Sequence, residues 1–115
     1  MNNILQEADK LTSGDRNIDY GHPLDDFTKV VEMAKSLGLV QESYTVRNHC
    51  IYMVLVKLSR ELNKPKRDNV VDAAGYLRTL EMCDEEIERR LSPENEAIRP
   101  EKEADDGWIE NITGE

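Results

Sequence analysis

Apolar residues recur at helical spacing in four segments of this chain, and glycine or proline stands where each pattern stops. Side chains at i, i+3, i+4 and i+7 share one face of an α-helix, while glycine and proline are typical of helix ends. Short loops between helices favour antiparallel packing. The pattern therefore predicts an all-α, four-helix bundle-like fold, with helices over about 2–13, 23–38, 42 or 43 to 63, and 68–91.

The expected helix that ends at residue 63 places the strongest constraint on how the helices can pack. Its centre, CIYMVLV at residues 50–56, is apolar nearly all round, which is typical of a helix covered on every side. We expect it to be the buried middle helix of the bundle. The three other helices supply too little cover, so the sequence also predicts a homo-oligomer that assembles through the bundle.

The net charge of −9 is concentrated at the C-terminal end of the 115-residue chain. Residues 1–83 hold 12 acidic and 11 basic side chains, whereas residues 84–115 hold 12 acidic and 4 basic ones. Because no concentrated positive surface is present, a duplex nucleic-acid partner is not expected. We expect one helical domain over residues 1–91 and an acidic tail over 92–115 that is disordered or lies on the surface, with Trp108 and Ile109 either docked or exposed.

No segment approaches the apolar length that a membrane span needs, and the N-terminal residues MNNILQEADK lack a signal-peptide pattern. The sequence therefore predicts no membrane partner and a cytoplasmic location. Cys50 and Cys83 both fall among apolar helical positions, and in a reducing compartment they are expected to be buried small apolar side chains.

The clearest chemical pattern is K-x2-R-x7-D-x3-D-x2-G-Y, which runs from Lys57 to Tyr76. Asp68 and Asp72 are four residues apart, so on one helix they share a face and can direct their oxygens to one point. Mg²⁺ prefers oxygen ligands and is often held by one or two carboxylates together with substrate phosphates. We predict that both aspartates ligate Mg²⁺, or Mn²⁺ in its place, opposite Lys57 and Arg60.

Both carboxylates have a simpler alternative. Asp68 follows Pro65-Lys66-Arg67 and suits the N-cap of the last helix, where its side chain would accept a bond from a backbone N–H. Asp72 lies among apolar residues of that helix, where an ionised carboxylate needs a partner. A salt bridge with Lys57 or Arg60 would supply one.

The segment over residues 14–23 has no helical period and carries more polar and aromatic groups than a connector requires. Arg16 offers a planar fork of donors for phosphate, while Tyr20 and His22 offer rings for a base or ribose. Tyr76 completes the predicted substrate-binding set for a nucleotide ligand. The alternative is a structural turn in which the aspartates of the segment cap backbone groups.

The blocks TSGDRNIDYGHPLDDF, KLSRELN and RDNVVDAAGYL together resemble an uncharacterised family of short phage and prophage proteins. The resemblance covers about residues 4–81 and rests on several separated blocks that match in order. For a phage-encoded protein, the expected location is the cytoplasm of the host cell.

More distantly, the helical order and the late acidic pair are similar to the all-α NTP pyrophosphatases of the MazG and dimeric dUTPase type. This resemblance implies Mg²⁺-dependent cleavage of a nucleoside triphosphate to monophosphate and pyrophosphate, in a bundle completed by oligomerisation. In such a reaction Lys57 and Arg60 would be the catalytic residues that neutralise developing charge.

The chain departs from the acidic pattern of that superfamily, which has EExxE on one helix and ExxD on the next. The second block here reads Asn69-x2-Asp72, and the first contains at most Asp25, Asp26 and Glu32. Three functions therefore stay open. The leading hypothesis is a Mg²⁺-dependent nucleoside triphosphate pyrophosphohydrolase. The alternatives are a non-catalytic protein that sequesters a nucleotide, and a small structural or regulatory oligomer whose acidic tail binds a partner.

Overall fold

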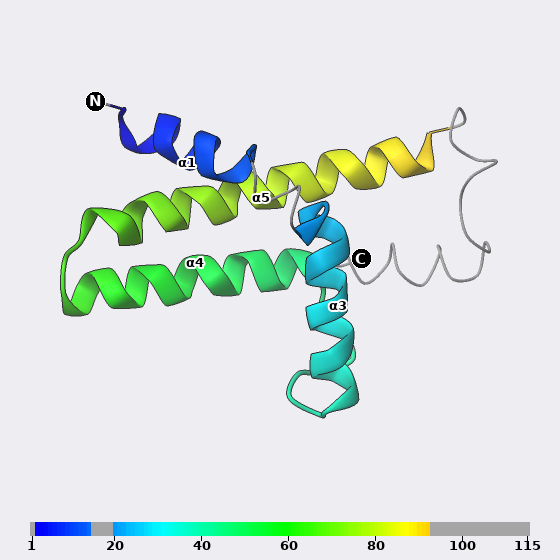
Figure 1. Cartoon of the computed structure of the whole chain (residues 1–115). Helices are drawn as coiled ribbons and strands as arrows, with labels where there is room; N and C mark the ends of the chain where they lie inside the picture. Colours follow the sequence, from blue (N-terminus) through cyan, green and yellow to red (C-terminus); the bar gives the residue numbers. More distant parts are fainter. Residues whose placement is uncertain (1, 15–19, 93–115) are drawn as a thin grey trace.

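The computed structural model describes residues 2–14 and 20–92, which form four α-helices. They are α1 (Ile4–Thr12), α3 (Pro23–Ser36), α4 (Val46–Asn63) and α5 (Arg67–Leu91). α4 and α5 form an antiparallel hairpin, α1 lies along α5, and α3 crosses the hairpin near the end away from its turn (Figure 1). The all-α, bundle-like fold predicted from the sequence is therefore confirmed. None of the helices in the described part of the chain is long and apolar enough to cross a membrane.

Local sequence signals set several helix ends. Asn3 and Thr45 each form a capping box. In each box, the cap side chain accepts from the backbone N–H of the residue three positions later, and the side chain of that later residue accepts from the backbone N–H of the cap. α3 ends in a Schellman-type turn, in which Gly38 takes a φ of 71° and the residue after it donates to a carbonyl of the last helical turn. α4 begins at Val46 rather than at residue 42 or 43, because Thr45 is the residue that caps it.

The turn between α4 and α5 is fixed from the end of α4. Oε1 of Glu61 accepts from the Lys66 N–H at 2.8 Å and from Nδ2 of Asn69 at 3.3 Å. The N-cap of α5 is Lys66, which makes no capping bond through its side chain. The alternative role of Asp68 as the N-cap is therefore wrong. Asp68 is exposed in the first turn, where a negative charge favours the positive end of the helix dipole.

The apolar core lies where α3 crosses the hairpin. Its buried members come from three helices: Leu24 and Val31 on α3, Val46 and Cys50 on α4, and Cys83 and Ile87 on α5. Each full burial of such a side chain stabilises the fold by roughly 1.5–3 kcal/mol. Both cysteines are free and buried, which confirms the prediction made for them.

α4 is not the buried middle helix that its apolar centre predicts. Ile51, Leu55 and Leu62 are exposed to between 43% and 89%. The positions of the other helices explain this exposure, because α1 packs against α5 and α3 crosses only one end of the hairpin. Among the described helices, α5 alone covers α4 along most of its length.

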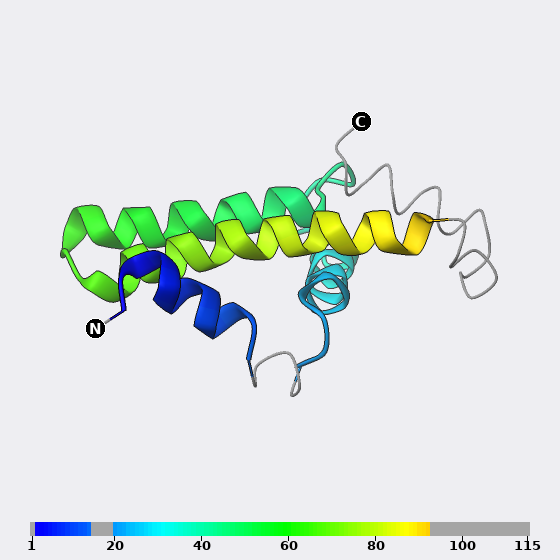
Figure 2. The same cartoon turned by 90° about the horizontal axis from the view of Figure 1, so that it is seen from above.

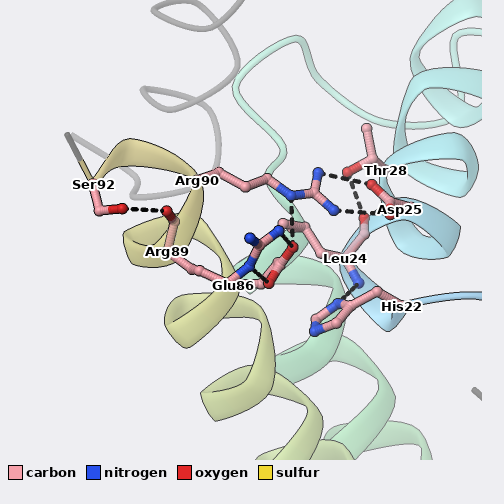
Figure 3. A network of polar contacts seen from close by, with 8 residues as sticks. All are labelled: His22, Leu24, Asp25, Thr28, Glu86, Arg89, Arg90 and Ser92. Atoms are coloured by element: carbon pink, nitrogen blue, oxygen red, sulfur yellow. Dashed lines mark hydrogen bonds and ion pairs between the residues drawn. The ribbon is translucent and has the colours of Figure 1, made fainter. Parts of the chain in front are cut away.

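A polar clamp joins the start of α3 to the end of α5 (Figure 3). Arg90 donates to the two carboxylate oxygens of Asp25, each at 2.9 Å, and its Nε donates to Glu86 at 2.8 Å. Arg89 donates twice to Glu86, at 2.7 and 2.8 Å. The hydrogen bonds from Arg89 and Arg90 lower the pKa of Glu86 to about 2, and Arg90 lowers the pKa of Asp25. The clamp therefore fixes the first turn of α3 against α5.

Candidate functional site

A pocket of about 360 Å³ lies between the four helices, beside the last residues of the 14–23 segment. α5 contributes the largest share of its lining, because residues at i, i+3, i+4 and i+7 present one helix face to it. The lining comprises Val71, Asp72, Gly75, Tyr76 and Thr79 of α5, Leu11 and Thr12 of α1, Tyr20 and Gly21, Pro23, Asp26 and Phe27 of α3, and Lys57 of α4.

Small residues shape the wall where α1 meets α5. A Cβ on Gly75 would stand 3.6 Å from Cγ2 of Thr12, which is an ordinary van der Waals distance. The hydroxyls of Thr12 and Thr79 donate to backbone carbonyls of their own helices, at 2.9 and 2.8 Å. A hydroxyl that donates to its own helix can still accept a bond, so Thr79 can offer an acceptor to a ligand.

Lys57 and Asp72 form the charged part of the pocket. Nζ of Lys57 lies 3.0 Å from Oδ2 of Asp72, and their side chains are 15% and 38% exposed. The salt bridge considered as the alternative for Asp72 is therefore present, with Lys57 as the partner. An ammonium group has three donors, so Lys57 can hold Asp72 and a ligand oxygen at the same time. Asp26 adds a second carboxylate from α3.

Aromatic residues also line the pocket. Phe27 and Tyr76 stack with their ring centroids 6.4 Å apart and an interplanar angle of 28°. Tyr20 lines the pocket with a largely exposed side chain. Behind Phe27, His49 meets the ring edge-on at 4.9 Å. Burial lowers the pKa of His49 although the charge of Asp26 acts in the opposite direction, so the imidazole is neutral near pH 7.

Four of the predicted site residues line this pocket: Tyr20, Lys57, Asp72 and Tyr76. They come from the segment before α3, from α4 and from α5, so only the fold brings them together. Their predicted roles toward a ligand stay predictions, while their common location is an observation.

The other predicted site residues lie elsewhere. Asp68 and Arg60 are exposed on α5 and α4, and neither lines the pocket. His22 is the N-cap of α3, where its Nδ1 accepts from the Leu24 N–H at 3.0 Å and burial lowers its pKa (Figure 3). Arg16 lies outside the described residues.

The two aspartates predicted to share a metal ion do not both reach the pocket. Asp72 pairs with Lys57 of the neighbouring helix, whereas Asp68 faces solvent one turn earlier. Within residues 2–14 and 20–92, no three His, Cys, Asp or Glu side chains stand close enough together to hold a metal ion. Asp26 and Asp72 are the two carboxylates that line the pocket, and they come from different helices.

Sequence patterns alone place Asp26 only in an incomplete acidic block and give no role to Phe27 or Gly75. Helical spacing contains a signal that points to Phe27, because it lies four residues after Pro23, and both residues line the pocket. No local pattern predicts the Asp25–Arg90 pair of the clamp, whose members are 65 residues apart.

Known proteins match the helical region of this chain. Residues 3–84 match the domain of unknown function DUF6378. The Gene 55 protein of Mycobacterium phage D29 is 32% identical over 84 residues, which make up 72% of this chain and 54% of that protein. The chain therefore spans about half the length of this relative. No solved structure matches the chain.

These matches support the resemblance to an uncharacterised phage family, and they do not extend to the NTP pyrophosphatases of the MazG type. The pocket lining lies wholly between residues 11 and 79, within the matched region. The chain thus belongs to the DUF6378 family and is similar to a mycobacteriophage protein.

Proposed function

We propose that this protein binds a nucleotide in the pocket between its four helices. The observation that carries the proposal is the combination of Lys57 with aromatic rings in a cavity of about 360 Å³. The ammonium group of Lys57 has three donors and forms an ion pair with Asp72. Small-molecule sites are typically cavities of roughly 300–1,000 Å³ with an apolar lining and a few converging polar groups. A nucleotide matches this lining because it joins a flat base to an anionic phosphate chain.

The lining suggests a role for each group. Tyr20 and Tyr76 would stack on the base, since a base presents a π-face to an aromatic ring. Lys57 would donate to a phosphate oxygen with the N–H groups that Asp72 leaves free. Arg16 and Arg60 remain candidates for contacts with the outer phosphates. Arg60 is exposed on α4, and Arg16 lies outside the described residues.

The carboxylates of the pocket fit a phosphate-bound divalent cation. Asp26 and Asp72 would supply one or two oxygen ligands, and Mg²⁺ commonly takes the remainder from phosphates and water. When bound, such an ion would polarise the phosphoryl oxygens. Asp72 would then exchange part of its contact with Lys57 for the cation, which releases Lys57 toward the phosphate.

A second candidate function is the Mg²⁺-dependent pyrophosphohydrolysis implied by the distant resemblance. The two carboxylates from separate helices favour it, since hydrolysis of this kind needs acidic side chains around the phosphates. The described residues add no third ligand to that pair. Binding without turnover is therefore the function that the geometry supports better.

Isothermal titration with a panel of nucleoside mono-, di- and triphosphates, each with and without Mg²⁺, tests the proposal. We expect at least one nucleotide to bind, and Lys57→Met to weaken that binding at least about ten-fold, which corresponds to about 1.4 kcal/mol. Lys29→Met is the matched control, because Lys29 is an exposed lysine on α3. If no nucleotide of the panel binds the folded protein, the proposal is wrong.

Pyrophosphate release in the same mixtures separates the two candidates. Binding without release supports the sequestering function, whereas metal-dependent release that is lost in Asp72→Asn supports the hydrolase. Circular dichroism of the Asp72→Asn variant provides the control for folding, because this substitution also removes the salt bridge to Lys57.

A further inference from the structure

Exposed apolar residues follow one side of α4. Ile51, Leu55, Leu58 and Leu62 are spaced four, three and four residues apart, and each is exposed. This spacing keeps a stripe in line along a helix and is the seam pattern of two helices packed against each other. We name these four residues the α4 stripe.

The stripe lies on the side of the hairpin away from the pocket. Arg47 is four residues before Ile51, so it shares the face of the stripe, and it forms an ion pair with Asp84 of α5. Leu77 is two helical turns before Asp84 on the same face of α5, and its side chain is exposed. Lys57, by contrast, lies on a different face of α4 and lines the pocket.

No described helix covers the stripe. Figure 2 shows α1 and α3 on one side of the hairpin, and residues of both helices line the pocket. A contiguous apolar surface of this kind, bordered by charged residues, is typical of a protein–protein contact.

We propose that a second copy of this chain covers the α4 stripe, with the two α4 helices antiparallel around a two-fold axis. The axis passes between residues 55 and 58, so that Ile51 of one copy meets Leu62 of the other, and Leu55 meets Leu58. Such an interface is self-complementary, since the same patch serves both copies. Two hairpins joined in this way form a four-helix bundle with α4 at its centre.

The charges along the hairpin favour this orientation. The turn end, residues 60–68, carries four basic and two acidic side chains, whereas residues 81–91 of α5 carry five acidic and two basic ones. In the antiparallel pair, the basic end of one copy lies beside the acidic half of the other. A parallel pair would place like charges together, which opposes association.

Light scattering across a dilution series tests the surface. The full chain is expected at twice its mass of 13.2 kDa. Leu55→Arg, which places two like charges in the contact, should weaken self-association at least about a hundred-fold and leave the helical circular dichroism unchanged. Leu5→Arg is the matched control and should stay dimeric, because Leu5 is an exposed leucine on α1. A monomeric full chain, or a dimer that survives Leu55→Arg, would overturn the proposal.

Disulfide cross-linking with molecular oxygen as the oxidant tests the orientation. The double variant Ile51→Cys/Leu62→Cys should join two copies covalently, because these positions meet in the antiparallel pair. Leu62→Cys alone should not, since the offset of eleven positions between 51 and 62 separates the two introduced cysteines by about 16 Å along the helix axes. The native thiols do not interfere, because Cys50 and Cys83 are buried. Efficient cross-linking of Leu62→Cys alone would show a parallel pair and refute the proposed arrangement.

Discussion

Replacement of Glu86 by glutamine should destabilise the fold in a pH-dependent way. Glu86 receives hydrogen bonds from both Arg89 and Arg90 in the clamp between α3 and α5, and its side chain is only 12% exposed. Glutamine keeps the shape of the side chain, removes its charge and replaces one acceptor oxygen with an N–H donor. The substitution therefore tests the charge of the clamp and the hydrogen bonds that depend on it, while leaving the packing in place.

The size of the effect follows from the pKa of Glu86, which the two arginines lower from 4.5 to about 2. A difference of about 2.5 pH units corresponds to roughly 3 kcal/mol of folding free energy. Because Arg89 is half exposed, solvent screening reduces this value, and we expect a loss of about 2–3 kcal/mol at pH 7.

The direction of the pH dependence is fixed by the lowered pKa. Since the folded pKa is below the unfolded one, the stabilisation is fully present above the unfolded value of 4.5 and is lost as the pH falls toward 2. Near pH 3, protonation of the unfolded chain reduces the contribution to less than about half of its value at pH 7. The difference between wild type and Glu86→Gln should shrink accordingly.

Urea unfolding followed by circular dichroism at pH 7 and pH 3 measures this difference. Glu88→Gln is the matched control, because it makes the same chemical change at an exposed position of the same helix. It should change stability by less than about 0.5 kcal/mol at either pH. A loss in Glu86→Gln that is the same at both pH values, or equal to that of the control, would refute the electrostatic account of the clamp.

Three further substitutions test individual features. Gly75→Ala should raise the melting temperature, because alanine favours a helix by roughly 0.5–1 kcal/mol and its Cβ meets Thr12 at an ordinary distance, but it should weaken nucleotide binding by filling the pocket. A lower melting temperature would contradict this. Thr45→Ala removes the capping box of α4 and should lower the urea-unfolding free energy by about 1 kcal/mol, whereas an unchanged value would show that the cap is dispensable. Gly38→Ala forces a φ of 71° on an L-residue and should cost roughly 1 kcal/mol by the same assay; a neutral effect would show that the turn relaxes.

The local sequence determined where the helices lie, because most helix ends depend on residues within one turn of each other. For this reason the sequence predicts the helix breaks at Gly38 and at Asn63-Lys64-Pro65. The start of α3 at Pro23 is also as predicted. The start of α4 was missed because Thr45 forms its capping box with Asn48, where glutamate or glutamine is the usual partner.

The sequence predicts only part of the pocket lining. Lys57, Asp72 and Tyr76, which fall in one sequence pattern, line the same pocket, since α4 and α5 are joined by a short turn and pack as a hairpin. Asp68 is exposed and does not line that pocket, because a shared helix face does not determine which part of that face a neighbouring helix covers. The contribution of α3, through Asp26 and Phe27, depends on a crossing that no local pattern encodes.

The tertiary structure alone decided which apolar surface is covered. Periodicity shows that α4 is apolar nearly all round, but it does not say whether α1 packs on α4 or on α5. In this fold α1 lies along α5, so the α4 stripe is left exposed. The physical reason is that burial of apolar area is non-directional: it favours contact with any complementary apolar face, and only the arrangement of the whole chain selects the partner.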